Sequence, residues 1–493
     1  MIDLRRSIFL ITVIISIFST VLLPSSKSAG NLNLPEVFSN NMILQRNVTV
    51  PVWGTARSEE RITVEFDNQT KSTIADNNGN WSVKLNPMKA GGPFKMKVFD
   101  AEGESINLKN ILVGEVWICA GQSNMNLDLK EIGLDKKDFN KINNKNLREF
   151  RCAMPEGAIN PENIDHSKWI PAGDTATKRF SAVAYYFAQK IQEVEKVPVG
   201  IIVMSCGATR AETWISMKTL KKYTALKPML NYWSGKMHDN KYLINFKPSI
   251  FYKSVVEPVI PFAIKGIVWY QGESNTLPDN SGRTILSRAD EYETLLKALI
   301  TSWRKVWNDE NLPFNIVQLP NYSDPSGNIY WSVIRQAQLD ISQKMKNVGL
   351  TVTIDLGGNG ATLHPHKKEP VGDRIALWAL AKVYGKKGIV FSGPIIRSMN
   401  VSDGKVYLTF KHIGKGLVCR NDDTLNGFEI SGNSSRDKFI KANAVIKDSQ
   451  VVLSAPGLKN PYAVRYAWAD NPAVSLFNAE GLPACPFYIS RQK

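Results

Sequence analysis

The stretch VGEVWICAGQSNMNLDL, residues 113–129, carries a serine directly after a short apolar run. The run over 116–119 is typical of a buried strand, and Gly121 gives the backbone the freedom for a tight turn. Ser123 follows between a glutamine and an asparagine. On this pattern alone, a strand that ends in a polar turn is the simpler explanation. A nucleophile at the carboxyl edge of a sheet is the alternative, and the rest of the chain must distinguish the two.

Around this stretch, apolar strands alternate with helical segments. Buried strands are predicted at 200–206, 265–272, 314–320 and 349–358. Helices, with apolar residues at helical spacing, are predicted at 181–196, 291–307 and 369–385. This alternation favours a parallel α/β sheet that is covered by helices on both faces. Ligands of such sheets bind at the carboxyl ends of the strands, where Ser123 would lie.

The two flanks of this region are predicted to be rich in β-strands. Short strands separated by turns are expected from Leu34 to about Leu112 and again from about Gly393 onward, which is typical of β-sandwiches. A chain of 493 residues is also too long for one ordinary core. We therefore expect an N-terminal β domain over 29–112, a catalytic α/β domain over 113–392 and a C-terminal β domain over 393–493.

The first 28 residues have the layout of a secretory signal peptide. Arg5 and Arg6 precede an apolar run from Ile8 to Leu23, and small residues follow it. The run is shorter than a comfortable membrane span, with an uncleaved anchor as the alternative. We find no second span, so we expect residues 1–28 to be removed and the mature protein to be soluble and secreted or periplasmic.

Charge, cysteines and histidines limit the classes of partner. The formal net charge is +16 and falls to +14 when residues 1–28, with three basic residues and one acidic residue, are removed. This surplus favours anionic partners such as acidic sugars, although a solvated basic surface also explains it. The lysines are not clustered with aromatic residues, so no nucleic-acid partner is predicted.

The five cysteines are too few for a disulfide scaffold and the five histidines lack metal-binding spacing, so no metal or other cofactor is predicted.

Other predicted strands also end in polar turns. These turns contain Gly207 in SCGATRAETW, Gln271 to Glu273 in WYQGESN, and Asp355 to His364 in DLGGNGATLHPHKKEPVG. A serine nucleophile needs an imidazole to accept its proton and fixed donors for the oxyanion. His364 could be the base, and the N–H groups of Ser123 and Gly207 with the amide of Gln271 could be the donors. Each residue alone has an ordinary structural explanation; together, at the ends of parallel strands, they favour a catalytic site.

These four blocks resemble those of the SGNH hydrolases, in the branch of sialate O-acetylesterases and related carbohydrate acetylesterases. Further similar segments, from FSNNMILQRN at 38–47 to VRYAWADNP at 464–472, extend the resemblance over nearly all of the mature chain. The resemblance implies Ser123 as nucleophile and His364 as base. It also implies Gly207 and Gln271 as oxyanion donors beside the Ser123 N–H group.

The chain departs from the wider superfamily at three points. The first block reads GQSN where GDSL is usual, and the third block has no asparagine at the usual place, which leaves Gln271, Glu273 and Asn275 open for that role. The aspartate that usually lies three residues before the histidine is replaced by Ala361. Asp355 is therefore the candidate that orients His364. A Ser–His dyad, a backbone carbonyl or Glu273 are the alternatives.

The expected function is that of an exported serine esterase that removes O-acetyl groups from sugars, with O-acetylated sialic acids as the expected substrates. Acetylated xylan or another glycan is the alternative substrate, and a non-catalytic carbohydrate-binding protein is the alternative from another class. Arg210 could pair with a sialic acid carboxylate, with an ordinary salt bridge as its alternative, and Glu273 could contact substrate. The α/β-hydrolase plan is disfavoured because Met125 interrupts the GxSxG pattern. The oligomeric state is not predicted.

Overall fold

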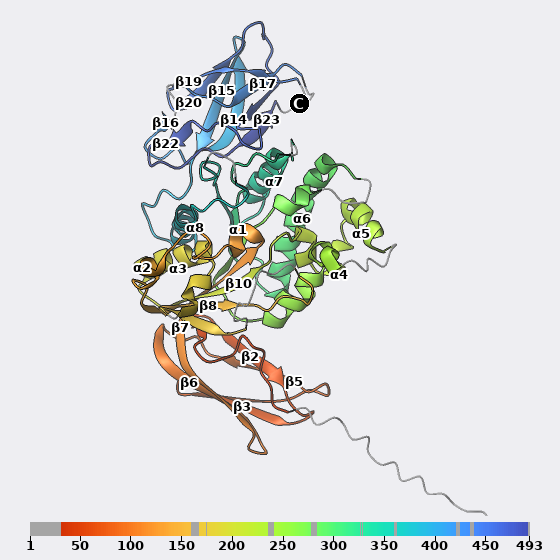
Figure 1. Ribbon diagram of the computed structural model, residues 1–493, viewed down its shortest axis with the longest axis vertical. Coiled ribbons are helices and arrows are strands. Elements are labelled where there is room, and N and C mark those ends of the chain that lie inside the picture. Colours follow the sequence, from red (N-terminus) through yellow and green to blue (C-terminus); the bar gives the residue numbers. More distant parts are fainter. Residues whose placement is uncertain are drawn as a thin grey trace, which may run out of the picture.

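The computed structural model arranges the chain as three regions stacked along the long axis of the molecule (Figure 1). It describes residues 31–491 except 159–166, 174, 235–240, 278–282, 326, 328, 359–361, 421–423 and 434–437. The expected signal peptide over 1–28 lies outside the described residues. No helix among those that are described is long and apolar enough to span a membrane.

The helices and strands follow one another in an order that changes twice along the chain. The helices are α1 (Ser123–Asn126), α2 (Lys136–Phe139), α3 (Ala182–Glu195), α4 (Met217–Leu220), α5 (Lys227–Ser234), α6 (Ile285–Val306), α7 (Trp331–Lys344) and α8 (Glu369–Lys382). The first strands are β1 (Ile43–Gln45), β2 (Val50–Thr55), β3 (Arg61–Phe66), β4 (Gln69–Ile74), β5 (Asn80–Leu85), β6 (Gly91–Asp100) and β7 (Ser105–Gly121). The middle strands are β8 (Asn144–Arg151), β9 (Trp169–Ala172), β10 (Val199–Ser205), β11 (Gly266–Tyr270), β12 (Phe314–Val317) and β13 (Val348–Thr351). The last strands are β14 (Ile395–Ser402), β15 (Lys405–Lys411), β16 (Leu417–Cys419), β17 (Phe428–Ser431), β18 (Ile440–Lys441), β19 (Asn443–Lys447), β20 (Gln450–Ser454), β21 (Ala463–Tyr466), β22 (Leu476–Asn478) and β23 (Phe487–Ser490).

The middle region contains the predicted α/β sheet. Its strand order is β13-β12-β11-β7-β10-β8-β9, with β7 paired in parallel to β10 on one side and to β11 on the other. The edge strand β9 pairs antiparallel with β8, so the sheet is mixed rather than wholly parallel. The α/β class is confirmed, and the central position of β7 places the turn that follows it in the middle of the carboxyl edge.

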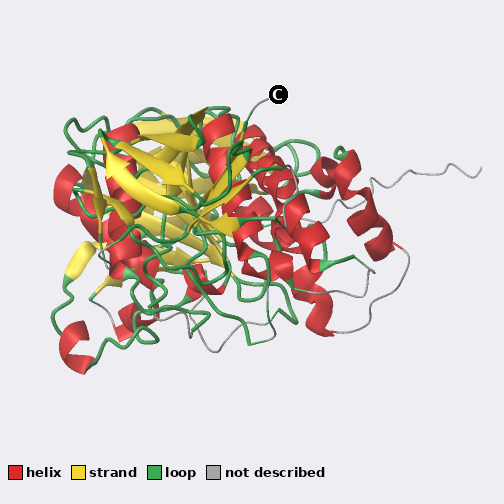
Figure 2. Cartoon of the chain, turned by 90° about the horizontal axis from the view of Figure 1, so that it is seen from above, coloured by secondary structure: helices red, strands yellow, loops and turns green. Residues whose placement is uncertain are grey.

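The alternation of side chains along β7 explains why both faces of this sheet are covered. Trp117 and Cys119 point into a core that α3 and α8 complete, whereas Ile118 and Ala120 belong to a second core with α6 and α7. All four side chains are fully buried. Figure 2 shows helices on either side of the strands. A continuous apolar strand is what a sheet buried on two faces requires.

The long strand β7 also belongs to the N-terminal region. Its first half pairs antiparallel with β6, and β6 in turn pairs with β3, while β1 pairs in parallel with 112–114. The boundary expected between residues 112 and 113 therefore falls inside one continuous strand. The two regions are joined by the strand itself, without a linker.

The C-terminal region is built from small antiparallel sheets. Two of them have four strands, in the orders β14-β15-β20-β19 and β18-β17-β21-β23, and β16 pairs with β22. Both flanks of the chain are thus rich in β-strands, as expected, and their assignment as sandwiches stays a prediction.

A buried arginine fastens this C-terminal region to the middle one. Arg335 of α7 donates to the carbonyls of Ala469 and Asp470 at 2.6 and 2.7 Å, and to the carbonyls of Leu319 and Pro320 in its own region. The Asp470 carboxylate accepts hydrogen bonds from the N–H groups at the start of α7, including that of Trp331 at 2.7 Å. The segment around 470 is therefore an integral part of the middle region's surface.

Candidate active site

The turn after β7 exposes Ser123 at the edge of the sheet. Gly121 has φ of +143°, and a Cβ atom at this position would lie 2.0 Å from the carbonyl oxygen of Tyr270. Only glycine fits so close to the neighbouring strand. The N–H group of Gln122 donates to that same carbonyl at 3.1 Å, and α1 then starts at Ser123. The sequence thus forces a sharp strand-to-helix turn that leaves the serine half-buried at the carboxyl edge.

His364 reaches this serine from the loop before α8. Its Nε2 atom lies 2.8 Å from Ser123 Oγ, although 241 residues separate the two along the chain. Burial lowers the pKa of His364, and the nearby Lys368 and His366 lower it further. An imidazole that stays neutral near pH 7 can accept a proton, so the pair has the geometry and the protonation state of a nucleophile and its base. His366 is exposed.

Gly207 lies beside the serine, in the turn after β10. A Cβ atom on Gly207 would lie 3.8 Å from Ser123 Cβ, and the Gly207 carbonyl accepts a hydrogen bond from Asn245 Nδ2 at 2.7 Å. In the described part of the chain, no group accepts a hydrogen bond from the N–H of Ser123 or of Gly207. Both N–H groups can therefore donate to an oxyanion, and their assignment to that role stays a prediction.

Gln271 does not have a free amide for this purpose. Its Nε2 atom has three acceptors within reach: Gln122 Oε1 at 3.1 Å, the Thr209 carbonyl at 3.1 Å and Asn275 Oδ1 at 2.7 Å. The amide has only two hydrogens, and the side chain is fully buried. In this structure Gln271 links the turns that contain Gln122, Thr209 and Asn275 by hydrogen bonds. The expectation that it donates to an oxyanion is not supported by this geometry.

Asp355 lies elsewhere than the sequence suggests. Strand β13 ends at Thr351, four residues before it, and Arg374 of α8 binds both carboxylate oxygens at 2.7 Å. Among the described residues, no hydrogen bond joins Asp355 to His364, and no group accepts one from His364 Nδ1. The residue that replaces the usual aspartate, Ala361, is outside the described residues. In the part of the chain that the structure describes, Ser123 and His364 therefore form a hydrogen-bonded pair, and no carboxylate binds the imidazole.

The two residues expected to contact substrate are buried. Arg210 is 1 % exposed, and it donates to the carbonyls of Ser274 and Leu277 at 3.2 Å. Burial lowers its pKa to about 9. Glu273 is 4 % exposed and accepts a hydrogen bond from Asn124. Both expectations are corrected: neither side chain is available to a ligand in this conformation, because each binds other parts of the chain.

A polar chain behind the serine was not anticipated from the sequence. Lys368 Nζ donates to Asn124 Oδ1 at 2.6 Å, and Asn124 Nδ2 donates to Glu273 Oε1 at 2.6 Å. The same Nδ2 atom donates to the carbonyl of Leu363 at 3.2 Å. Two signals in the sequence could have revealed it: an asparagine directly after the serine, and a lysine four residues after the histidine.

A second buried network holds the other end of α1. Asn126 Oδ1 accepts hydrogen bonds from Arg151 Nη1 at 2.9 Å and from Ser205 Oγ at 3.0 Å. Arg151 also pairs with Glu149, and both side chains are at most 5 % exposed. The end of the short helix that carries the serine is therefore held by side chains of β8 and β10, two strands of the same sheet.

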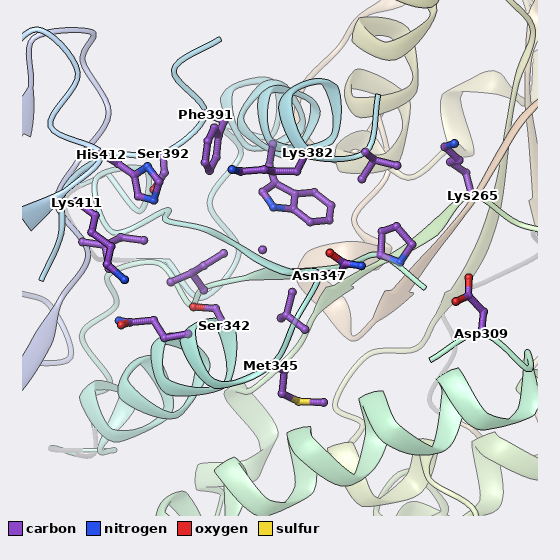
Figure 3. A pocket seen from close by; sticks show the side chains of 18 of the residues that line it. Lys265, Asp309, Ser342, Met345, Asn347, Lys382, Phe391, Ser392, Lys411 and His412 are labelled. Carbon is purple, nitrogen blue, oxygen red and sulfur yellow. The ribbon is translucent and has the colours of Figure 1, made fainter. Parts of the chain in front are cut away.

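A separate cavity of about 630 Å³ lies at the opposite end of the sheet (Figure 3). It is lined by the start of β13, by the end of α8 and by the C-terminal region, with Lys382 and Lys411 near His412. Lys382 lies 4.5 Å from the centre of the Phe391 ring. Because β13 and β7 run in the same direction, this cavity and Ser123 are at opposite ends of the strands.

Comparison with known proteins identifies a family. Residues 113–377 match the family described as carbohydrate esterase, sialic acid-specific acetylesterase. The sialate O-acetylesterases of Homo sapiens and Pongo abelii are each 26% identical to this chain, with 95% of this chain and 94% of each relative covered. The crystal structure of a carbohydrate acetylesterase from Xanthomonas citri is 31% identical and superposes with a TM-score of 0.79, covering 94% of this chain and 100% of that one. With a family match over more than half of its residues and this likeness along nearly its whole length, the chain belongs to the sialic acid-specific acetylesterase family of carbohydrate esterases and is a carboxylic ester hydrolase.

Proposed function

We propose that this protein is an exported serine esterase that removes O-acetyl groups from sugars, with Ser123 as nucleophile and His364 as base. The observation that carries the proposal is the 2.8 Å contact between Ser123 Oγ and His364 Nε2 at the carboxyl edge of the central sheet. Export rests on the basic and apolar composition of residues 1–28.

The reaction proceeds through an acetyl-enzyme. Ser123 Oγ attacks the acetyl carbonyl while its proton moves to His364 Nε2, and the N–H groups of Ser123 and Gly207 stabilise the oxyanion. When the tetrahedral intermediate collapses, His364 gives the proton to the departing sugar oxygen. A water molecule then loses a proton to His364 and attacks the acetyl group, and acetate leaves as Ser123 regains its hydrogen.

An O-acetylated sialic acid is the proposed substrate, because the matched family and the two mammalian relatives are named for that sugar. Arg210 does not support this choice, since it is buried and bound to main-chain carbonyls. The substrate is best tested by acetate release from a panel of O-acetylated sialic acids and acetylated xylan fragments. Faster release from the sialic acids supports the proposal, and release from xylan alone would reassign the sugar.

The nucleophile is tested by Ser123→Ala. Loss of a serine nucleophile typically lowers kcat by roughly a million-fold, so hydrolysis of p-nitrophenyl acetate should fall to background. The side chain is half-buried and small, so the melting temperature should change little. A folded Ser123→Ala protein with near-normal turnover would refute the mechanism, and absence of turnover in the wild type would favour a carbohydrate-binding role.

A further inference from the structure

We infer that Lys368, Asn124 and Glu273 form a buried polar relay that positions the Ser123–His364 pair, in place of a carboxylate on the imidazole. The inference rests on the proposed function, because it assigns positioning residues to that reaction. None of the three side chains is expected to touch substrate, since Lys368 is 1 %, Asn124 0 % and Glu273 4 % exposed.

The chemistry of the three groups allows only one orientation of the asparagine. A lysine ammonium can only donate hydrogen bonds and a carboxylate can only accept them. Asn124 therefore turns Oδ1 to Lys368 and Nδ2 to Glu273, each at 2.6 Å. An amide can accept a hydrogen bond from a buried cation and donate one to a buried anion at the same time, without adding charge. The relay thus bridges two opposite charges that would each be costly to bury alone.

The relay joins the three chain segments that make the site. Asn124 directly follows the nucleophile after β7, and Glu273 lies in the turn after β11. The third segment is the histidine loop, which the relay holds twice: Asn124 Nδ2 binds the Leu363 carbonyl, one residue before His364, and Lys368 lies just before α8. Movement of the loop away from the serine would break these hydrogen bonds. The relay therefore fixes the distance between nucleophile and base.

The relay also acts on the protonation of the base. Among the described residues, the titratable groups that lower the pKa of His364 are Lys368, just before α8, and His366, from its own loop. Burial lowers the pKa of Lys368 to about 7, and Glu273 opposes that shift. Asp355 is engaged by Arg374. Removal of the Lys368 charge should therefore raise the pKa of His364, and a larger share of the imidazole would be protonated at mildly acidic pH.

An exchange of charges tests the relay directly. In Asn124→Asp, a carboxylate oxygen replaces Nδ2 and faces Glu273 Oε1, so kcat/KM for p-nitrophenyl acetate should fall by at least about thirtyfold. In the double variant Asn124→Asp with Glu273→Gln, the glutamine amide can donate to the new carboxylate, and one anion again faces Lys368. We expect the double variant to regain at least about tenfold over Asn124→Asp. Recovery should stay incomplete, because the Leu363 carbonyl loses its donor.

Two results would overturn the relay in this experiment. One is an Asn124→Asp enzyme with nearly normal kcat/KM. The other is a double variant that is as impaired as the product of the two single variants, since independent residues would give that result. If Asn124→Asp does not fold, the lysine supplies a second test.

The pH dependence of kcat/KM shows whether Lys368 acts on the protonation of His364 or only fills space in the core. In Lys368→Gln, the acidic limb of the pH profile of kcat/KM should move to higher pH by roughly half a unit to one unit, because His364 gains proton affinity when the neighbouring charge is removed. The plateau value of kcat/KM should also fall, because His364 is held less firmly. Lys367→Gln is the matched control, since Lys367 is the adjacent exposed lysine, and its limb should stay in place. An acidic limb that is unchanged in folded Lys368→Gln would refute the electrostatic part of the relay.

Failure of the relay can be told apart from failure of the proposed function. If wild-type hydrolysis does not depend on Ser123, the proposed function fails and the relay with it. If hydrolysis depends on Ser123 while the exchange and the pH profile give the contrary results above, only the relay fails.

Discussion

At the residue level, two histidines on either side of Pro365 provide a sharp contrast. Only His364 contacts Ser123 Oγ, whereas His366 is exposed. His364→Ala should lower kcat for p-nitrophenyl acetate by at least about a thousandfold, because loss of the base leaves the hydroxyl unactivated. His366→Ala should keep most of the activity, with a small upward shift of the acidic limb, since His366 lowers the pKa of His364. The reverse pattern would move the base by two residues.

Asp355 now gives the opposite prediction to the one that its sequence position suggests. Its carboxylate binds Arg374 through two hydrogen bonds of 2.7 Å, and both side chains are partly exposed, at 16% and 13%. Asp355→Asn should therefore cost about 1 kcal/mol of stability and lower turnover by less than about tenfold. Denaturant titration and steady-state kinetics on the same preparation measure both. A large loss of turnover without a loss of stability would restore Asp355 as the partner of His364.

These residues also show which features of the site could be predicted from the sequence and which could not. Ser123 and His364 could be proposed as a pair because each block has a distinctive composition and follows a strand that the sequence predicts. The roles of Gln271, Arg210 and Glu273 could not, because the same polar residue types serve a ligand when exposed and satisfy other polar groups when buried. Burial is a property of the tertiary structure. Resemblance to a family suggested Ser123 and His364, which the structure places in contact, but it did not reveal which other side chains already bind parts of the chain.

At the level of elements, α7 is the piece that holds the C-terminal region in place. Arg335 is fully buried, its pKa is lowered by burial to about 10, and its guanidinium donates to four carbonyls on both sides of the junction. Arg335→Met should lower the free energy of unfolding by about 3 kcal/mol, because the buried carbonyls lose their donors.

The matched control for this change is Arg397→Met in β14, where the arginine is exposed. Chemical denaturation should show a change of no more than about 0.5 kcal/mol for this control. Equal effects of the two substitutions would mean that Arg335 contributes no more than a surface arginine.

The elements themselves were largely predictable in the middle region. Segments such as 181–196 and 200–206 form a helix and a strand because their apolar residues repeat with the period of each. The predicted strand over 349–358 is shorter in the structure and ends at Thr351. Apolar residues alone did not reveal this end, because Ile354 and Leu356 are buried without belonging to the strand.

At the level of the whole molecule, β7 makes the N-terminal region inseparable from the catalytic one. A chain that starts at Val113 would retain the buried second half of β7 but lose β1 and β6, which pair with β7, and β3, which pairs with β6. We expect this truncation to be insoluble, because the cores around Val113 and Ile118 would be exposed. A chain that starts at Asn31 should be soluble and active. Soluble expression of the shorter chain with esterase activity would contradict the prediction.

The continuous strand also bears on how this architecture can be inherited. A strand of 17 residues spans about 55 Å, and its two halves hydrogen-bond to neighbours in different regions. Recombination at this junction would have to join two half-strands in register, since a slip of one residue would turn Trp117 and Cys119 to the wrong face. Exchange of the N-terminal region between unrelated genes is therefore disfavoured. A region that is joined by a flexible linker can be exchanged between genes without this constraint on register. The region before Val113 should descend together with the hydrolase, as a single inherited unit, and the likeness to the Xanthomonas citri enzyme over 94% of the chain agrees with such co-descent.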